Sequence, residues 1–168
     1  MRKKFVAGNW KMNMDASGAV MLASGLKEQL SGCDKSNVVD VAVCPPFVYL
    51  ATVGAVLKNS NIAVGAQDVY FETNGAFTGE ISVDMLKDVG CRFVIVGHSE
   101  RRHVMCETDE LINKKVLAAL EGGLEVIFCI GELLEERQQN KTEAVNERQL
   151  RNGLANVTKE QMAKVTAA

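Results

Sequence analysis

Short apolar runs alternate with amphipathic helical patterns along the 168-residue chain, and this alternation limits the fold more than any other feature. The runs are rich in β-branched residues and cover residues 5–7, 38–44, 62–66, 93–96 and 124–130. Apolar residues recur at helical spacing between them, at 17–30, 47–58, 82–89 and 109–121, and a more charged helical stretch follows at 132–154. Strands that alternate with helices form parallel sheets, so we expect one α/β domain over residues 1–168, either an open doubly wound sheet or a barrel.

The turn after the first strand helps to choose between these two folds. Residues 8–13 lack the Gly-x-Gly-x-x-Gly spacing that brings backbone close to a pyrophosphate in open dinucleotide-binding sheets, and no Walker sequence occurs in the chain. This difference favours the barrel. Near the end of the chain, a short helical segment after Thr158 leads to residues 165–168, which look like the opening of a sixth strand.

Composition excludes several function classes. Nineteen basic and 21 acidic residues give a net charge of −2, so the chain has no electrostatic footprint for nucleic acid or an anionic membrane. Its apolar runs are too short for a membrane span or a secretory signal, and we expect a cytoplasmic protein. We expect the five cysteines to be reduced, buried small hydrophobes, because they form no Cys-x-x-Cys pair: Cys33, Cys44, Cys91, Cys106 and Cys129.

Residues 93–103 combine a predicted buried strand with a cluster of polar side chains. The apolar run 93–96 ends at Gly97, and the sequence His-Ser-Glu-Arg-Arg-His follows at once. Ligands of parallel α/β folds bind beyond the carboxyl ends of the strands, so we expect a functional site here. The alternative is that His98 is the N-terminal residue of a helix and that the charges belong to a solvated turn.

Two other strand ends carry polar side chains that suit the same site. Asn9 and Lys11 follow the first strand, and Gln67 follows the third. If these ends converge with His98, an ammonium and a neutral N–H donor surround one point, where they can polarise a carbonyl and stabilise an enolate oxygen. Each residue alone is a weak signal, since a single lysine is most often a solvated charge. No metal site is expected, because His98 and His103 are five residues apart and no His-Glu-x-x-His or carboxylate-rich loop occurs.

A long loop is predicted at residues 67–79. It contains the aromatic residues Tyr70, Phe71 and Phe77, with Gly75 and Gly79 near its tip. Loops of about 12 residues or more inside a compact domain are usually functional or bind a partner. The alternative is a surface excursion that is packed by its own aromatic side chains.

Six motifs, in order and in spacing, make the whole chain similar to the triosephosphate isomerase family. They are FVAGNWKMN at 5–13, CPPFVYL at 44–50, GAQDVY at 65–70, GAFTGEIS at 75–82, VIVGHSERRH at 94–103 and CIGE at 129–132. The resemblance implies a (β/α)8 TIM barrel of which only about the first five βα units and the start of the sixth strand are present. It also implies interconversion of dihydroxyacetone phosphate and D-glyceraldehyde 3-phosphate through an enediol(ate), in glycolysis and gluconeogenesis, without metal or cofactor.

The same resemblance assigns roles to residues of the predicted site. It implies that Lys11 binds substrate and offsets its negative charge, and that Asn9 positions it. His98 becomes the neutral imidazole electrophile, in a family that is the standard example of a histidine kept neutral by a helix N-terminus. Glu100 supports the lysine with Ser99 beside it. A structural ion pair is expected between Arg102 and Glu107.

A homodimer is a further implication of the resemblance. In the family, the loop after the third strand inserts into the other subunit. Its tip here consists of Gly75, Ala76, Phe77, Thr78 and Gly79. Thr78 is then expected to reach towards the partner's Lys11 and the partner's His98.

One departure from the family pattern concerns length. A full barrel takes about 250 residues, so we expect the part with the family's catalytic glutamate, lid and phosphate loops to be missing. Glu100, Glu107 and Glu132 belong to other motifs and do not match the base. We therefore expect the 168 residues alone to be inactive, and to self-associate through open sheet edges or to complement a C-terminal fragment. A generic α/β binding domain is the alternative outside the family.

Overall fold

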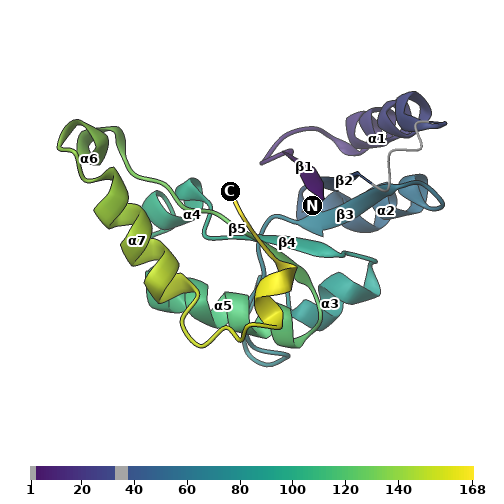
Figure 1. Cartoon of the computed structure of the whole chain (residues 1–168). Helices are drawn as coiled ribbons and strands as arrows, with labels where there is room; N and C mark the ends of the chain where they lie inside the picture. Colours follow the sequence, from purple (N-terminus) through teal and green to yellow (C-terminus); the bar gives the residue numbers. More distant parts are fainter. Residues whose placement is uncertain (1–2, 33–37) are drawn as a thin grey trace.

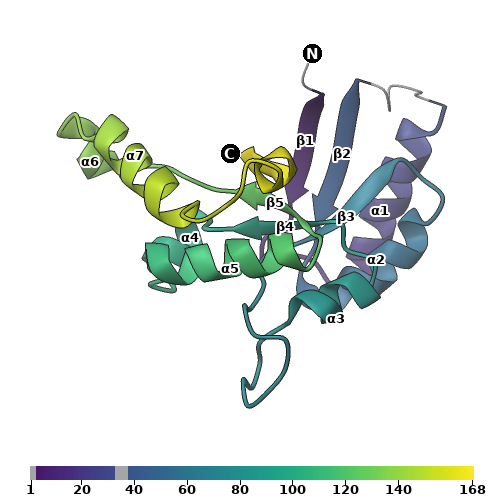
Figure 2. The ribbon, with the colours of Figure 1, turned by 60° about the horizontal axis from the view of Figure 1, so that its bottom comes forward.

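Six parallel strands form one curled sheet, which is part of a (β/α) barrel (Figures 1 and 2). The computed structural model describes residues 3–32 and 38–168. The strands are β1 (Lys4–Asn9), β2 (Val39–Cys44), β3 (Ile62–Ala66), β4 (Phe93–Val96), β5 (Glu125–Phe128) and β6 (Val165–Ala167). Strands that are consecutive in sequence are neighbours in the sheet, from β1 at one edge to β6 at the other. This order is that of a barrel rather than a doubly wound sheet, and it confirms the predicted fold.

Helices connect the strands and cover the outer face of the sheet (Figure 2). They are α1 (Ala16–Leu30), the 3-10 helix η1 (Phe47–Tyr49), α2 (Leu50–Leu57), α3 (Val83–Asp88), α4 (Ser99–His103), α5 (Asp109–Glu121), α6 (Leu134–Gln138), α7 (Thr142–Gly153) and the 3-10 helix η2 (Gln161–Lys164). Thr108 caps the N-terminus of α5, because its hydroxyl accepts a hydrogen bond from the Leu111 N–H at 3.3 Å. Across the described part of the chain, no helix has both the length and the apolar character that a membrane crossing needs.

The charged stretch at 132–154 forms two helices instead of one. The chain turns between α6 and α7 at Asn140, which has a φ of 58°, and both helices project from the body of the molecule (Figure 1). Asparagine tolerates this left-handed conformation better than most residues with a side chain. In α7, Val145, Gln149 and Gly153 are buried, whereas Leu134 of α6 is exposed.

The core lies on both faces of the sheet, with the larger part between the strands and the outer helices. In β4, Val94 and Val96 belong to the outer cluster, whereas Phe93 and Ile95 belong to a smaller cluster inside the barrel. Successive residues of a strand point to opposite faces, so a run of four apolar residues can supply both clusters. All four are buried, as the uninterrupted apolar run predicted.

The described cysteines are free thiols, as predicted, but they differ in burial. Cys44 and Cys91 are buried, and Cys129 is half-buried. The prediction of burial is wrong for Cys106, which is exposed. Cys106 lies in the turn after α4 with a φ of 57°, where the chain reverses direction at the surface. Cys33 lies outside the described residues.

Candidate active site at the carboxyl ends of the strands

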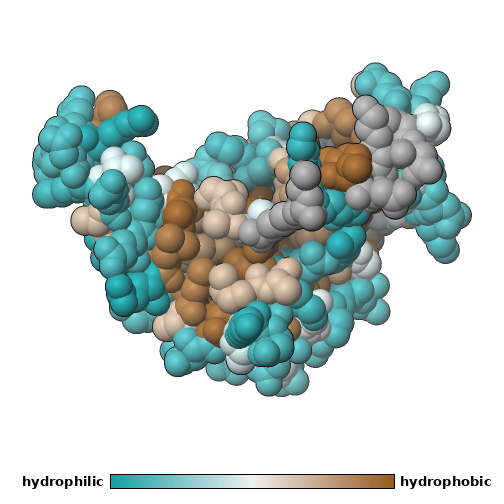
Figure 3. Space-filling model, viewed as in Figure 1, coloured by the Kyte–Doolittle hydropathy of each residue, from teal (hydrophilic) through white to brown (hydrophobic). Residues whose placement is uncertain are grey.

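The ends of β1, β4, β5 and β6 surround a cavity of about 460 Å³. Its lining is mostly apolar and includes Phe5, Ala7, Ile95, Ile127, Ile130 and Ala167. Polar lining comes from Asn9, His98, Ser99 and Thr166, with the Cys129 thiol beside them. Figure 3 shows apolar side chains exposed on this face, between α7 on one side and β1 on the other. An apolar hollow with a few convergent polar groups has the character of a small-molecule site.

Lys11 is held at the mouth of this site by three interactions. Its backbone adopts a left-handed φ of 53°. The main-chain N–H donates to Asn9 Oδ1 at 2.9 Å, and the main-chain carbonyl accepts from Gln67 Nε2 at 2.8 Å. The ammonium donates to Glu100 Oε1 at 2.6 Å, and the side chain is half exposed. Lys11 is not among the residues that line the cavity, but it is bonded to Asn9, which lines it, and to Glu100, which lies two residues after His98.

His98 is both the predicted site residue and the N-cap of α4. Its Nδ1 accepts a hydrogen bond from the Glu100 N–H at 3.3 Å, and it lies 3.4 Å from Glu100 Oε2. These two contacts compete, because the first needs a lone pair on Nδ1 and the second needs a proton there. A main-chain amide can only donate, and the Glu100 carboxylate already has Lys11 as its partner, so Nδ1 acts as the acceptor. A neutral ring then carries its proton on Nε2, available to the cavity that His98 lines.

Glu100 is an anion at neutral pH. The hydrogen bond from Lys11 holds the pKa of this carboxyl below its usual range, and the positive charge of Lys11 acts in the same direction. The expectation that Glu100 supports the lysine therefore agrees with the geometry. Ser99, unlike Glu100, lines the cavity, next to His98.

Four charged side chains form a cluster in which Asp68, Glu107 and Lys115 are buried and Arg101 is half-buried, and the sequence analysis did not predict it. Lys115 Nζ donates to both carboxylate oxygens of Asp68, at 2.9 and 2.7 Å, and also contacts Glu107 Oε1. Arg101 Nε lies 2.9 Å from Asp68 Oδ2 and 2.7 Å from Glu107 Oε1. Burial raises the pKa of Asp68, and the positive charge of Lys115 opposes that rise. We call Asp68, Arg101, Glu107 and Lys115 the buried charge cluster.

One signal in the sequence could have revealed this cluster. Lys115 occupies the apolar face of α5, between Ile112 and Val116, and its side chain is only 2% exposed. A lysine at such a position needs a buried carboxylate as its partner, because an unpaired buried ammonium is very costly. The helical spacing alone did not say which carboxylate it would be.

The predicted ion pair between Arg102 and Glu107 is wrong. Arg102 Nη1 instead pairs with Asp109 Oδ1 at 2.6 Å, and its Nε and Nη2 donate to main-chain carbonyls just after β4 and β5, at 2.7 and 3.1 Å. Glu107 belongs to the buried charge cluster. The cause is the turn at Cys106, which brings the Glu107 N–H onto the Arg101 carbonyl at 3.0 Å and so places its carboxylate under Arg101.

The loop between β3 and α3 projects away from the body of the molecule (Figure 2). Its tip at residues 75–79 is exposed. The ring centroids of Tyr70 and Phe71 are 4.4 Å apart, and those of Tyr70 and Phe77 are 4.9 Å apart. The loop is therefore packed by its own aromatic side chains, as one of the two alternatives expected, and it also presents an exposed tip, as the other requires.

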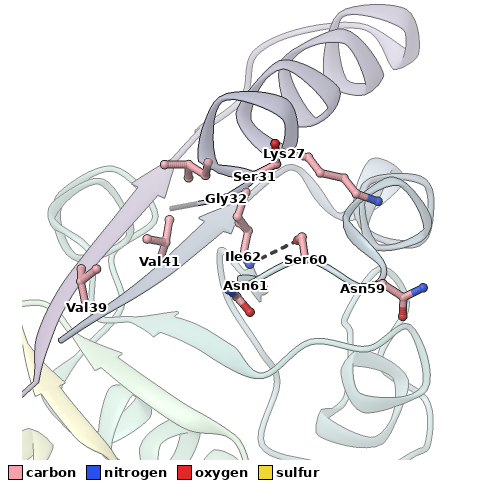
Figure 4. Close-up of a pocket in the computed structure, with 10 residues that line it drawn as sticks. Lys27, Ser31, Gly32, Val39, Val41, Asn59, Ser60, Asn61 and Ile62 are labelled. Carbon is pink, nitrogen blue, oxygen red and sulfur yellow. Dashed lines mark hydrogen bonds between the residues drawn. The ribbon is translucent and has the colours of Figure 1, made fainter. Parts of the chain in front are cut away.

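A second cavity, of about 450 Å³, lies between α1, β2 and the turn before β3 (Figure 4). Val41 and Ile62 supply apolar lining, and Lys27 extends past its rim. The charge of Lys27 is already used, because its Nζ donates to two carbonyls at the end of α2, each at 2.9 Å. Ser60 likewise accepts from the Ile62 N–H at 3.2 Å. None of the residues that line this cavity belongs to the strand-end site of Lys11 and His98.

Over residues 3–32 and 38–168, no group of three or more His, Cys, Asp or Glu side chains is placed to hold a metal ion.

Comparison with known proteins agrees with the resemblance. The family model described as Triosephosphate isomerase matches residues 4–168. Curated proteins named triosephosphate isomerase from Carboxydothermus hydrogenoformans and Treponema denticola are 52% and 53% identical to the chain over 168 residues. The one from Chloroherpeton thalassium is 49% identical over 168 residues. Each of the three alignments covers 100% of this chain and 66% of the relative, so the chain spans about two thirds of their length.

Proposed function

Because the chain belongs to the triosephosphate isomerase family, we propose that it forms part of an enzyme that interconverts dihydroxyacetone phosphate and D-glyceraldehyde 3-phosphate. In this proposal the enzyme serves glycolysis and gluconeogenesis in the cytoplasm and needs no cofactor. The observation that carries it is an anchored lysine next to a histidine that lines the strand-end cavity and whose Nδ1 faces a main-chain amide. Lys11 is anchored at its main-chain N–H, its carbonyl and its Nζ, and His98 has its Nδ1 occupied by a main-chain amide.

The geometry suits the formation of an enediolate. A base removes a proton from the carbon next to the carbonyl, the electron pair of that C–H bond forms a C=C bond, and the π pair of the carbonyl moves onto its oxygen. His98 donates its Nε2–H to the oxygen atoms where charge develops, and Lys11 offsets the charge. Asn9 fixes the Lys11 backbone and lines the cavity. Donors and charges that are fixed before the reaction stabilise the transition state without reorganising, and this is usually the largest electrostatic contribution to catalysis.

The base has to come from elsewhere than the described lining of the cavity, which contains no Asp or Glu side chain. Glu100 is bound to Lys11, Glu107 is buried in the charge cluster, and Glu132 accepts from the Thr142 hydroxyl at 3.1 Å. We propose that the base lies in the additional third of the barrel by which the relatives exceed this chain. A polypeptide limited to residues 1–168 is then expected to have no isomerase activity.

A second candidate is a non-catalytic role of the 168 residues as a fragment that self-associates or complements another chain. The observation in its favour is the edge strand β1, where Val6 is 59% exposed. Unpaired strand edges with apolar side chains favour pairing with further strands. The remaining units of a barrel, supplied as a second chain, would cover this edge and close the cavity.

We further propose that the loop at 67–79 binds a second copy of the chain. Support comes from its exposed tip, Gly75 to Gly79, and from the aromatic packing that shapes it before any partner binds. A preformed loop loses little conformational entropy on binding. In the homodimer, Thr78 would approach the partner's Lys11 and the partner's His98.

A coupled assay with both triose phosphates tests these proposals, combined with sedimentation. The purified 168-residue chain is expected to be inactive. Addition of a fragment that supplies the remaining barrel units is expected to restore isomerisation and to change the size of the particle. Activity of the chain alone, with its mass confirmed, would refute the placement of the base. A complemented particle of the right size without activity would refute the isomerase and leave the second candidate.

A further inference from the structure

We propose that Gln67 is a positioning residue for Lys11, which it fixes through the main-chain carbonyl of that lysine. The inference rests on the proposed function for its meaning in catalysis, but the contact itself can be tested without any activity. Gln67 lies just after β3, outside the turn that carries Asn9 and Lys11, and its carboxamide reaches across to the ends of two other strands.

Both N–H groups of the Gln67 carboxamide can be used at once. Nε2 lies 2.8 Å from the carbonyl oxygen of Lys11 and 2.8 Å from the carbonyl oxygen of Cys44. The Cys44 carbonyl also accepts from the Trp10 N–H at 3.1 Å. One side chain therefore connects the ends of β1, β2 and β3, and the turn after β1 is fixed relative to the two neighbouring strands.

Lys11 needs this support because its backbone is strained. A φ of 53° is unfavourable for any residue with a side chain, and it persists only where the surroundings enforce it. The Asn9 carboxamide holds the N–H of Lys11 and the Gln67 carboxamide holds its carbonyl. These two bonds lie on either side of the Cα atom, so together they fix φ and ψ. The direction of the Cα–Cβ bond, and hence the start of the path to Nζ, follows from them.

Gln67 is itself well anchored, which a positioning residue must be. The next residue, Asp68, is buried and binds both Lys115 and Arg101. The backbone at 67–68 is thus attached to α5 and α4 through charge-assisted bonds, which are among the stronger bonds in proteins. Without the Gln67 carboxamide, the Lys11 carbonyl would lose the side-chain donor that holds it, and the turn could relax towards an unstrained φ.

The ion pair between Lys11 and Glu100 reports the position of the ammonium. The hydrogen bond from Lys11 holds the pKa of Glu100 below its usual range, so displacement of Nζ must raise that pKa. We would titrate the Glu100 carboxyl by carbon-13 NMR in this chain and assign it with Glu100→Gln. The variants are Gln67→Leu, Lys11→Met and the double variant.

We expect Lys11→Met to raise the pKa of Glu100, and Gln67→Leu to raise it in the same direction by a smaller amount. In the Lys11→Met background, Gln67→Leu is expected to change nothing further, because its effect acts through the lysine. An unchanged Glu100 titration in Gln67→Leu, or an equal rise in both backgrounds, would overturn the proposal. If Gln67→Leu does not fold, Gln67→Met removes the same donors with a side chain of nearly equal length.

Gln149→Leu is the matched control. Gln149 is a buried glutamine whose carboxamide also bonds to a main chain after a strand, with the N–H and the carbonyl of Gly131 at 2.9 and 3.0 Å. It has no bond to Lys11. An equal rise in the pKa of Glu100 in both glutamine variants would show general loosening of the fold and would refute a specific role of Gln67.

The catalytic consequence is measured in the active enzyme, formed by this chain together with the remaining barrel units. Gln67→Leu is expected to lower kcat/KM about tenfold, the scale of one or two lost hydrogen bonds. In the Lys11→Met background, Gln67→Leu is expected to lower kcat/KM further by about twofold or less. An enzyme that is inactive before any substitution would refute the proposed function alone, since the NMR titration still decides the position of Lys11. A tenfold loss in both backgrounds would refute positioning through Lys11.

Discussion

Replacing Lys115 with methionine tests the buried charge cluster directly. Methionine has a similar length and fits the apolar face of α5, so the substitution removes the charge with little change in volume. Asp68 and Glu107 would then share Arg101 as their remaining cation in the cluster. We expect a loss of about 3–5 kcal/mol in the free energy of unfolding, the range for removing one partner of a buried ion pair. For a chain of this size, that loss lowers Tm by about 10 °C.

The loss in unfolding free energy of Lys115→Met should depend on pH. Burial raises the pKa of Asp68 in the folded chain above its ordinary value of 3.8. A carboxyl whose pKa is higher in the folded state binds its proton more tightly there. Its contribution to stability is therefore greatest below the unfolded pKa and is lost as pH rises through the folded pKa. Lys115→Met removes the positive charge that opposes the rise in the pKa of Asp68, so this pKa is higher still in the variant. The stability lost by Lys115→Met is therefore expected to become smaller as pH falls from about 7 towards 4.

Urea unfolding of wild type and Lys115→Met at several pH values measures the stability loss and its dependence on pH. Subtracting the unfolding free energy of the variant from that of wild type at each pH cancels the contribution of all other carboxyls. Lys114→Met is the matched control, because Lys114 is the exposed neighbour on the same helix with its Nζ 5.1 Å from the Phe71 ring centroid. That control should lose less than about 1 kcal/mol. Asp68→Asn combined with Lys115→Met should recover part of the loss. A deficit of Lys115→Met below about 1 kcal/mol, or one that grows on acidification, would refute the reasoning.

Three further predictions concern the site, the loop and the thiols. In the complemented enzyme, His98→Ala should lower kcat about 10²-fold, the scale of a lost oxyanion donor, with unfolding free energy nearly unchanged, and near-normal turnover would contradict the assignment. Deletion of residues 75–79 should give monomers in sedimentation together with lower activity, and unchanged sedimentation would count against the proposed dimer. Burial raises the pKa of Cys44 and of Cys91 to about 12, so a disulfide reagent at pH 8 should label exposed Cys106 before either of them, as peptide mass spectrometry can show. Labelling of Cys44 before Cys106 would contradict this prediction.

The sheet could be predicted because its signals are local. The apolar runs at 62–66 and 93–96 coincide with β3 and β4, and the helix at 109–121 coincides with α5. Each of these segments is limited by glycine, by a capping residue or by a change in periodicity, all of which act within a few residues. The site residues could be placed near one another for the same reason, since parallel strands bring their carboxyl ends to one edge.

The pairing of charges could not be predicted, because it depends on turns that the sequence does not specify. Arg101 and Arg102 are adjacent on the five-residue helix α4, yet Arg101 pairs with Glu107 and Arg102 pairs with Asp109. The left-handed turn at Cys106 decides which carboxylate each arginine meets. From spacing along the chain, several carboxylates are within reach of each arginine, and nothing in the spacing shows which of them forms the ion pair.

The site and the core share two pairs of adjacent residues, and this arrangement links stability to the position of Lys11. Gln67 binds the Lys11 carbonyl while the next residue, Asp68, binds Lys115 in the core. Glu100 binds the Lys11 ammonium while the next residue, Arg101, binds Asp68. Adjacent side chains point in different directions, so each pair places one group in the site and one beneath it. We therefore expect a change in the buried charge cluster to act on Lys11 at both its carbonyl and its ammonium, whereas a change at Asn9 acts only at its N–H.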